Sequence, residues 1–540
     1  MSTLPPLLFV AASLAAASPA IGPVVERGAV FEVAQTVTPA PADPLRGVPA
    51  KVVFTGPGGQ TARVDLFWDG GEVWKARFAP DAVGVWRYEV RGEGLNVEGD
   101  PQTFTCVPSD RPGPPRVADG ARHFTRARPR GEGAGQPAPW FYLADTAWNG
   151  VLKAKPEDWD RFLDVRKAQG FTAIQFVGTQ WRGANDGLPV KPFTLTDGKV
   201  TGVNHDLLRA MDAKVAAIAA RGMAPAPVLL WALGPDDPGN AWSEEDAVLA
   251  ARYLKARWGA HGCVWLLGGD GKYPDADRWR TIGRGVFPEG ESDGSGVGRG
   301  PVTLHMAGRN WVFEPYADEP WFDFVGYQSG HGASDDDLKW LTHRRAAAEW
   351  RELELPLINL EPNYEAHPAY GTGVPHDAGA VRRAAWWSVL VAPPAGVSYG
   401  HNAGWVWNEQ AGPVEGHGGL RAGPWSDALN AEGAEDMGVL RRFLDVGPWT
   451  ELRPAPDLVV QQSDDPAAFV AAARTPDGKW TAIYTPGGGT VILSKAGLAH
   501  DGAWLRIDPR TGERTPLPID ESGVLQTPPG HDWVIERRSE

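Results

Sequence analysis

Cysteine is scarce in this 540-residue sequence, which contains only Cys106 and Cys263. Two thiols so far apart in the chain provide neither a disulfide framework nor a Cys-based zinc site. Basic residues are also in deficit, with 52 Lys and Arg against 67 Asp and Glu, for a formal net charge of −15. This excess of negative charge argues against nucleic acid or an anionic membrane surface as a partner.

Long hydrophobic runs are missing beyond the N-terminus, where no uninterrupted apolar stretch reaches the ~18 residues that span a bilayer. Residues 4–20 have an apolar centre followed by the small residues Ser18 and Ala20. This pattern predicts a signal peptide over residues 1–20 and a mature protein exported to the periplasm or the cell exterior. The segment before the apolar centre lacks Lys and Arg, so an N-terminal strand is the alternative.

Tryptophan is abundant, with 25 residues against 18 Phe and 10 Tyr. Most of these indoles must pack in cores. A few are expected to stack on a ligand, because a flat apolar face with one donor suits a sugar ring.

Two regions have the alternating apolar and polar pattern of short strands separated by Gly and Asp-Gly turns. The first, residues 21–110, predicts an N-terminal antiparallel β-sandwich, and the second, residues 455–540, predicts a C-terminal one. Residues 108–115 are rich in Pro and read as a linker.

Between them, residues 111–454 alternate apolar strands with amphipathic helices. Eight strand-helix units in this stretch predict a (β/α)8 TIM barrel, so that the fold class is α/β with two small flanking β-sandwiches. Loops 235–242 and 286–300 are expected to be insertions.

Two of these strands end in a carboxylate. The run Cys263–Gly271 ends at Asp270, and Leu357–Leu360 ends at Glu361 before Pro362. In one barrel both acids open onto the face where catalytic residues collect. A pair of carboxylates is what glycosidic bond cleavage requires, so we predict Asp270 as the acid/base and Glu361 as the nucleophile. A helix cap or a structural ion pair is the alternative for each acid.

Polar and aromatic residues follow the other strands and suit a mouth that binds sugar hydroxyls and stacks on a sugar face. The residues predicted to bind substrate are Asp145, Trp148, Trp231, His305, Gln328, His331, Tyr364, His401, Asn402 and Trp405. Each His can instead be a satisfied core histidine. No H-x-H or H-E-x-x-H spacing occurs, so we predict no metal and no other cofactor.

Five motifs together resemble the apiosidase-like glycoside hydrolases. They are Phe141–Trp148, Trp265–Asp270, Tyr327–His331, Asn359–Glu365 and Tyr399–Asn402. The resemblance implies a barrel with an N-terminal β-sandwich and a C-terminal domain labelled as collagen-binding, and it implies the same roles for Asp270 and Glu361. One departure from the wider clan of retaining barrels is that Asp270 follows two glycines, where that clan usually has the Glu of an Asn-Glu pair.

We therefore predict an exported glycoside hydrolase of the retaining type that acts on an oligo- or polysaccharide of plant or microbial origin. The alternatives are a catalytically silent carbohydrate- or matrix-binding protein on a barrel scaffold and, less favoured, metal-assisted hydrolysis. The sugar, the linkage, exo or endo action and the oligomeric state do not follow from the sequence.

Overall fold

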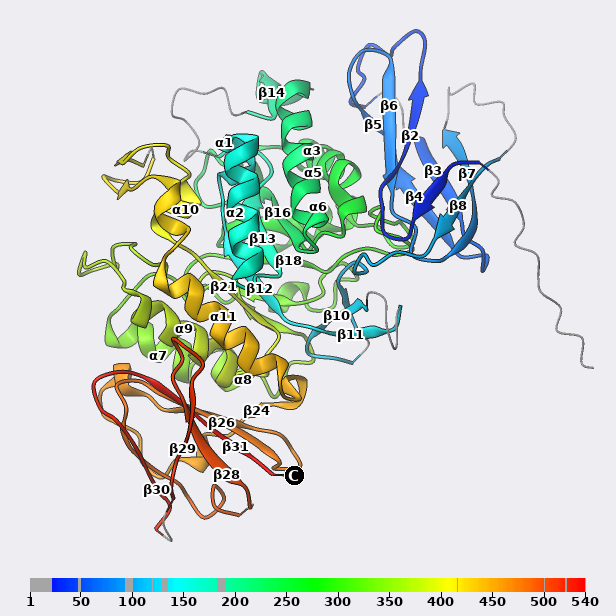
Figure 1. Cartoon of the computed structure of the whole chain (residues 1–540). Helices are drawn as coiled ribbons and strands as arrows, with labels where there is room; N and C mark the ends of the chain where they lie inside the picture. Colours follow the sequence, from blue (N-terminus) through cyan, green and yellow to red (C-terminus); the bar gives the residue numbers. More distant parts are fainter. Residues whose placement is uncertain are drawn as a thin grey trace, which may run out of the picture.

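The computed structural model describes residues 22–46, 50–92, 101–118, 120–128, 135–181, 191–414, 416–499, 501–519 and 522–539. The predicted signal peptide lies outside the described residues. Within them, no helix combines the length and the hydrophobicity needed to cross a membrane. A barrel lies between an N-terminal and a C-terminal β-domain (Figure 1).

The N-terminal domain contains two sheets, as the alternating pattern predicts. Phe54, Trp86 and Phe104 are fully buried in its core, because the inward positions of each strand are apolar. The first sheet has β1 (Val24–Glu26), β8 (Gln102–Val107), β7 (Gly84–Gly92), β3 (Ala50–Thr55) and β4 (Thr61–Asp65) in that order, and the second has β2 (Phe31–Thr36), β6 (Val73–Phe78) and β5 (Phe67–Trp68). Among the described strands of this domain, only β1 and β8 pair in parallel.

Eight parallel strands close the predicted barrel. They are fully buried apart from the end of β17, which explains their almost continuous apolar sequences. In order around the barrel they are β12 (Tyr142–Thr146), β13 (Ala173–Val177), β16 (Ala224–Trp231), β17 (Trp265–Gly271), β18 (Val302–Met306), β19 (Val325–Tyr327), β20 (Leu357–Asn359) and β21 (Gly396–Tyr399).

Helices surround the barrel. Pro156 begins α2 at its first position, and Ser334 caps α7 in a reciprocal capping box with Asp337, as expected from such residues at helix starts. The helices are α1 (Gly150–Lys153), α2 (Pro156–Ala168), α3 (His205–Ala220), α4 (Pro238–Ala241), α5 (Glu244–Trp258), α6 (Ala276–Val286), α7 (Asp335–His343), α8 (Ala346–Glu349), α9 (Ala378–Leu390), α10 (Asn402–Val406) and α11 (Glu432–Asp445).

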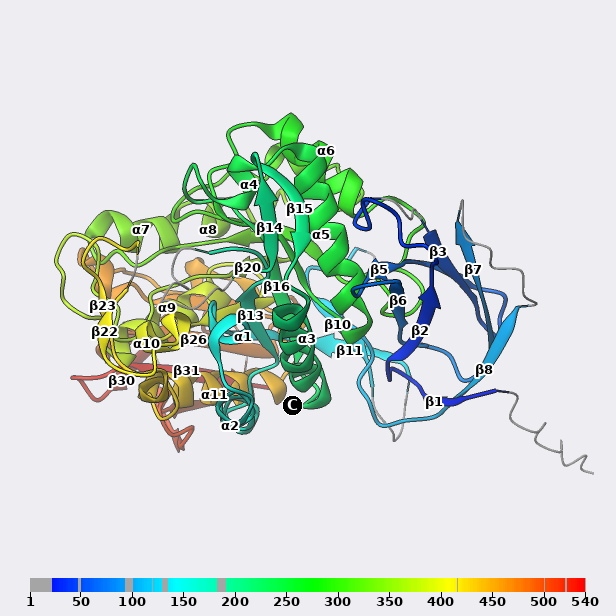
Figure 2. The same cartoon turned by 90° about the horizontal axis from the view of Figure 1, so that it is seen from above.

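Two elements were not predicted. A hairpin of β14 (Phe193–Thr196) and β15 (Lys199–Val203) follows β13 and lies near α4 (Figure 2). The region expected to be a linker leads into a small sheet of β9 (Arg116–Val117), β10 (Phe124–Ala127) and β11 (Pro137–Trp140). Trp140 belongs to β11, and the first barrel strand begins after it at Tyr142.

The C-terminal domain is again made of antiparallel strands. One sheet contains β24 (Arg453–Pro454), β25 (Ala471–Arg474), β26 (Trp480–Thr485), β31 (Trp533–Arg538), β28 (Ala503–Ile507) and β29 (Arg514–Pro516), and the other pairs β27 (Gly489–Ile492) with β30 (Val524–Thr527). The first sheet packs on α9, where Trp386 stacks on Tyr484 with ring centroids 5.9 Å apart. The domain therefore covers one side of the barrel.

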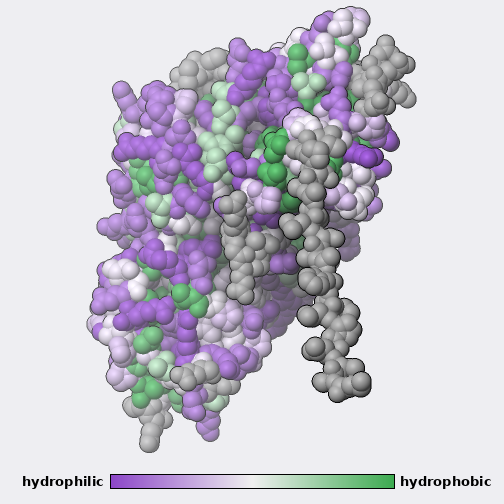
Figure 3. Space-filling model, turned by 45° about the vertical axis from the view of Figure 1, so that its right-hand side comes forward, coloured by the Kyte–Doolittle hydropathy of each residue, from purple (hydrophilic) through white to green (hydrophobic). Residues whose placement is uncertain are grey.

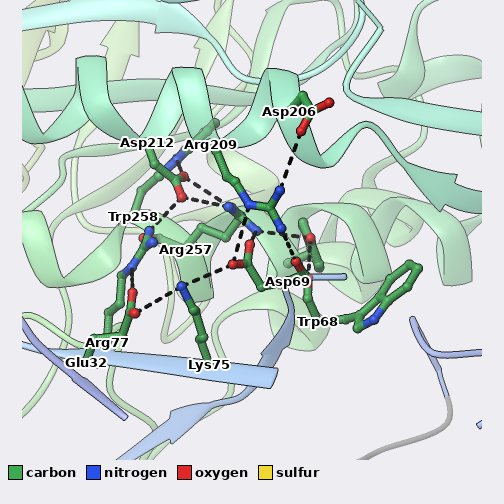
Figure 4. A network of polar contacts seen from close by, with 11 residues as sticks. Glu32, Trp68, Asp69, Lys75, Arg77, Asp206, Arg209, Asp212, Arg257 and Trp258 are labelled. Atoms are coloured by element: carbon green, nitrogen blue, oxygen red, sulfur yellow. Dashed lines mark hydrogen bonds and ion pairs between the residues drawn. The ribbon is translucent and has the colours of Figure 1, made fainter. Parts of the chain in front are cut away.

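Buried ion pairs fix the N-terminal domain to the barrel (Figure 4). Arg257 of α5 has a fully buried side chain that contacts Asp69 of the sandwich at 3.1 Å and Asp212 of α3 at 2.6 Å. Arg77 of β6 reaches Asp212 from the sandwich side at 2.9 Å. Because these charges are paired and hydrogen-bonded, the two domains share one desolvated polar interface.

The face of the molecule in Figure 3 offers no wide hydrophobic surface among its described residues. Hydrophobic residues there lie in small patches separated by hydrophilic ones.

Candidate active site

The two predicted acids lie at the same end of one barrel. Asp270 is the penultimate residue of β17. Glu361 follows β20, separated from its last residue by Leu360. Since all eight strands are parallel, their carboxyl ends form a single face. Asp270 has a left-handed backbone, with φ 49°, which a non-glycine residue adopts mainly where the surroundings impose it.

The glycines around Asp270 are required by packing. A Cβ on Gly269 would lie 2.4 Å from Cγ1 of Val228 and 2.6 Å from the Trp231 ring, and one on Gly271 would lie 2.4 Å from the Tyr273 ring. Small glycines before Asp270 could leave room for a close approach of sugar or backbone. The space is instead filled by Trp231 and Tyr273, which line the end of the strand.

The backbone before Glu361 is fixed by polar groups inside the barrel. The side chains of Gln175 and Ser398 both donate hydrogen bonds to the carbonyl oxygen of Leu360. Asn359 donates to the hydroxyls of Ser329 at 2.9 Å and Ser388 at 3.0 Å. The barrel core therefore sets the direction in which Glu361 leaves the strand.

Two histidines contact the Glu361 carboxylate. Nε2 of His331 lies 2.9 Å from Oε1, and Nε2 of His305 lies 3.4 Å from Oε2. Burial alone raises the pKa of Glu361, but these two contacts outweigh it and lower the pKa to about 2. Glu361 is therefore ionised across the physiological range, as a nucleophile must be.

His305 also connects the two acids. The backbone N–H of Asp270 donates to Nδ1 of His305 at 3.2 Å. With Nδ1 as acceptor, a neutral His305 carries its proton on Nε2 and presents it to Glu361. The His305 imidazole thus contacts the backbone at the end of β17 through Nδ1 and one oxygen of Glu361 through Nε2.

Tyr370 lies close enough to Glu361 and Asp270 to interact electrostatically with both carboxylates. Partial burial, followed by the negative charges of Glu361 and Asp270, raises the pKa of this phenol. The Tyr370 backbone N–H donates to the carbonyl of His331 at 2.9 Å. The loop that follows Glu361 therefore returns across the site.

Four tryptophans form a continuous aromatic wall beside the acids. Trp231 contacts Trp148 at 5.6 Å and Trp181 at 4.9 Å between ring centroids, and Trp181 contacts Trp405 at 5.5 Å. Trp148 also meets the His305 ring edge-on at 5.6 Å and donates to the Tyr364 hydroxyl at 3.0 Å. The wall therefore begins next to Glu361.

Buried polar atoms at the strand ends have no hydrogen-bond partner among the described residues. In native interiors such atoms are uncommon, and several at one edge of a sheet indicate a site for a ligand with many hydroxyls. The atoms on this face are Nε1 of Trp181, Trp231 and Trp405, Oε1 of Gln180 and Gln328, Nδ1 of His331 and Oδ1 of Asn402.

The aromatic wall continues into a groove of about 440 Å³. Gln180 and Trp181 line it on the barrel side, and Trp242, Leu195 of the hairpin and residues 234–238 close it. Gln180 is held by a 2.8 Å hydrogen bond to the carbonyl of Phe193 on β14. The unpredicted hairpin thus extends the mouth of the barrel.

Two residues predicted to bind substrate also make structural contacts. Asp145 forms an ion pair with the fully buried Arg166 and is itself 2% exposed. His401 caps α10, with Nδ1 accepting the N–H of Ala403 at 3.1 Å. Burial and the charge of Arg166 lower the pKa of His401 to about 4, so it is neutral.

The remaining predicted residues gather near the acids: Trp148, Trp231, His305, Gln328, His331, Tyr364, Asn402 and Trp405. Sequence reasoning missed Trp181, although it follows β13 in the way that the others follow their strands. It also missed Tyr370 and His367, which lie in an irregular loop without periodicity. The ring of His367 lies 4.5 Å from that of His331. Among the described residues, no cluster of His, Cys, Asp or Glu has the arrangement of a metal site.

Comparison with known proteins identifies the family. A model of the apiosidase-like catalytic domain matches residues 134–451. The chain belongs to the apiosidase-like family. This apiosidase-like protein is therefore a glycoside hydrolase, with its barrel as the catalytic domain. Residues 25–93 match a domain of unknown function that corresponds to the N-terminal sandwich.

Solved structures share the fold of this apiosidase-like protein. A glycoside hydrolase family 5 protein from Bacteroides vulgatus is 20% identical, with a TM-score of 0.63 over 79% of this chain and 94% of its own. Another structure described as a glycoside hydrolase has 20% identity and a TM-score of 0.62 over 79% of this chain and 97% of its own. A second Bacteroides vulgatus structure, provisionally assigned as a glycoside hydrolase, reaches 0.70 at 15% identity, over 96% of this chain and all of its own. No curated protein matches the sequence.

Proposed function

We propose that this protein hydrolyses a glycosidic bond in a plant or microbial glycan with retention of configuration. The observation that carries the proposal is the position of Glu361, a buried carboxylate held ionised by His305 and His331 at the barrel face that also bears Asp270. A retaining glycosidase needs one ionised carboxylate as nucleophile and one carboxylic acid as proton donor.

In the first step, Glu361 attacks the anomeric carbon and the bond from this carbon to the leaving oxygen breaks. Asp270 gives its proton to that oxygen, so the alcohol leaves neutral. In the second step, water attacks the anomeric carbon, its proton passes to the Asp270 carboxylate, and the bond to Glu361 breaks. Both residues return to their starting states.

The sugar that is cleaved would lie against Trp148 and Trp231, with Gln328 and Asn402 offering their unpaired amide oxygens to its hydroxyls. The groove beyond Trp181 has a volume of about 440 Å³, within the range of sites for small ligands. This groove could hold further sugar residues of the substrate, beyond the one at which the bond is cleaved.

The roles of the two acids are tested by conservative substitutions. Glu361→Gln and Asp270→Asn should each lower kcat by about 10²–10⁴-fold or more, because each removes a group that acts in the transition state. Turnover of aryl glycosides and plant polysaccharides is measured, with circular dichroism as the control for folding. Substantial activity in either variant would refute its role.

Export is part of the proposal and rests on residues 1–20. The prediction is that N-terminal sequencing of the protein recovered outside the cytoplasm begins at Ile21. Recovery of the intact N-terminus from the cytoplasmic fraction alone would contradict it. The collagen-binding resemblance of residues 455–540 stays a prediction, and the contacts of this domain with α9 support a structural role.

A further inference from the structure

A second hollow lies at the end of the barrel opposite the two acids. Thr172 and Gly222, which line it, come just before β13 and β16, so it opens at the amino ends of the strands. Its volume is about 800 Å³. Figure 1 shows β10 and β11, which contribute to it, at the end of the barrel away from α10 and the β14–β15 hairpin.

The hollow is strongly basic in a protein with a net charge of −15. Two carboxylates, Glu26 and Asp110, accompany six cationic side chains in its lining. The cations come from the linker region and from α2, the end of α3 and α11, far apart in the sequence. They are Arg111, Arg126, Arg128, Lys167, Arg221 and Arg441.

Three of these cations are already neutralised nearby. Arg221 pairs with Asp160 and Asp164, Arg441 pairs with Asp445, and Arg111 lies 3.6 Å from Glu26. For Arg126, Arg128 and Lys167, no ion pair with a carboxylate is present among the described residues.

Arg126 is the fixed centre of this group. Its side chain is about nine-tenths buried, and its guanidinium donates to the carbonyls of Gly113 at 2.6 Å and Gly222 at 3.0 Å. It also lies over the Trp140 ring, 5.3 Å from the centroid. These contacts orient the guanidinium, but among the described residues no carboxylate forms an ion pair with it.

The cations repel one another. Partial burial and the charges of Arg126 and Arg441 lower the pKa of Lys167. Like charges brought together in a hollow cost free energy, and an anion bound among them would offset that cost.

We propose that this hollow binds a glycan segment that carries carboxylate or sulfate groups. Cations spread over 800 Å³ match several anionic groups along a chain better than one small ion. The site is separate from the barrel mouth and does not depend on the proposed hydrolysis; it would hold an acidic region of the glycan.

The test uses the full-length protein with Glu361→Gln, so that no probe is degraded. Calorimetry measures binding of oligogalacturonate, of a neutral malto-oligosaccharide, of inorganic phosphate and of a short single-stranded DNA. The double variant Lys167→Ala with Arg128→Ala removes two exposed cations from the hollow. Lys339→Ala with Lys495→Ala removes two exposed cations elsewhere and is matched in charge.

We expect oligogalacturonate to bind, more weakly as salt rises, and the malto-oligosaccharide not to compete with it. The hollow variant should weaken this binding at least tenfold, and the matched control less than twofold. Unchanged binding in the hollow variant, or an equal loss in the control, would overturn the site. Phosphate or DNA binding as tightly as oligogalacturonate would overturn its assignment to a glycan.

Failure of this site and failure of the proposed hydrolysis have different signatures. Binding at the hollow is read without turnover, whereas the acids are tested by turnover without oligogalacturonate. If the protein hydrolyses aryl glycosides but does not bind oligogalacturonate, the glycan site in the hollow is contradicted and the proposed hydrolysis is not.

Discussion

Glu361 is the residue on which the proposed chemistry of this site depends, and its environment decides its charge. Burial would favour the neutral acid, but His305 and His331 contact both oxygens and reverse that preference. Because the pKa is lower in the folded protein, this carboxylate stabilises the fold above its unfolded pKa of about 4.3. That contribution is lost as the pH falls toward 2.

Removing His331 should therefore move the pH profile. In His331→Ala, burial is opposed by His305 alone, so the pKa of Glu361 rises and the acid limb of kcat/KM moves upward by about one to two pH units. The measurement is kcat/KM against pH on an aryl glycoside. His123→Ala is the control, because this histidine packs against Trp449 and not against Glu361. It should leave the acid limb of the profile unchanged.

A drop in rate with no movement of the acid limb would show that His331 supports the site only by packing. The distinction matters, because its ring also contacts Tyr364 at 4.4 Å and His367 at 4.5 Å. The pH profile separates the two roles, whereas kcat at a single pH does not.

At the scale of elements, strand ends were the part of the site that the sequence could reveal. Apolar runs that stop at Asp270 and Glu361 mark buried parallel strands, and parallel closure brings their ends together. Side-chain direction was not predictable in the same way. Asp145 also belongs to a strand end, but its carboxylate pairs with Arg166 of α2, on another element 21 residues later.

The elements that shape the mouth were the least predictable. The β14–β15 hairpin has short, partly exposed strands, and the loop around Tyr370 has no regular period. Their positions depend on contacts with residues far along the chain, such as Gln180 with Phe193 and Tyr370 with His331. Local sequence does not encode such contacts.

The glycines before Asp270 provide a test at this scale. In Gly269→Ala, the new methyl group would meet Val228 and Trp231, so the end of β17 or the indole must shift. We expect a loss of about 1–3 kcal/mol in unfolding free energy and a fall in kcat/KM. Urea unfolding and kinetics measure these effects.

Gly412→Ala is the matched control, because the nearest atom to its Cβ is the carbonyl oxygen of Gln410 at 3.9 Å. An unaffected Gly269→Ala enzyme would mean that the packing of Trp231 against β17 does not matter for the site.

At the scale of the whole molecule, the flanking sandwiches are joined to the barrel by buried polar contacts. Composition and strand patterning predicted these domains, but not the partners of their charges. Arg257 on α5 is paired with Asp69, which lies almost 190 residues away (Figure 4). On the other side, Arg382 of α9 pairs with Asp532 of the C-terminal domain at 2.6 Å.

Breaking the N-terminal interface should destabilise the molecule. Arg257→Met leaves Asp69 and Asp212 with less compensation for their buried charge, which costs about 3 kcal/mol or more. Arg209→Met is the control, since Arg209 is 51% exposed and lies 3.6 Å from the same Asp69. The loss of the Arg209 charge should lower the free energy of unfolding by less than about 1 kcal/mol.

Thermal unfolding followed by circular dichroism and calorimetry compares the two variants. Equal losses in Arg257→Met and Arg209→Met would contradict the role given to the buried pair.

The most direct test of the catalytic account is to trap the glycosyl-enzyme. A 2-deoxy-2-fluoro aryl glycoside of the sugar that the enzyme cleaves should inactivate it, because slowed hydrolysis leaves the covalent ester in place. Peptide mapping by mass spectrometry should then find one added glycosyl group on Glu361. A label on another carboxylate, or hydrolysis that gives the inverted anomer without any label, would contradict the account.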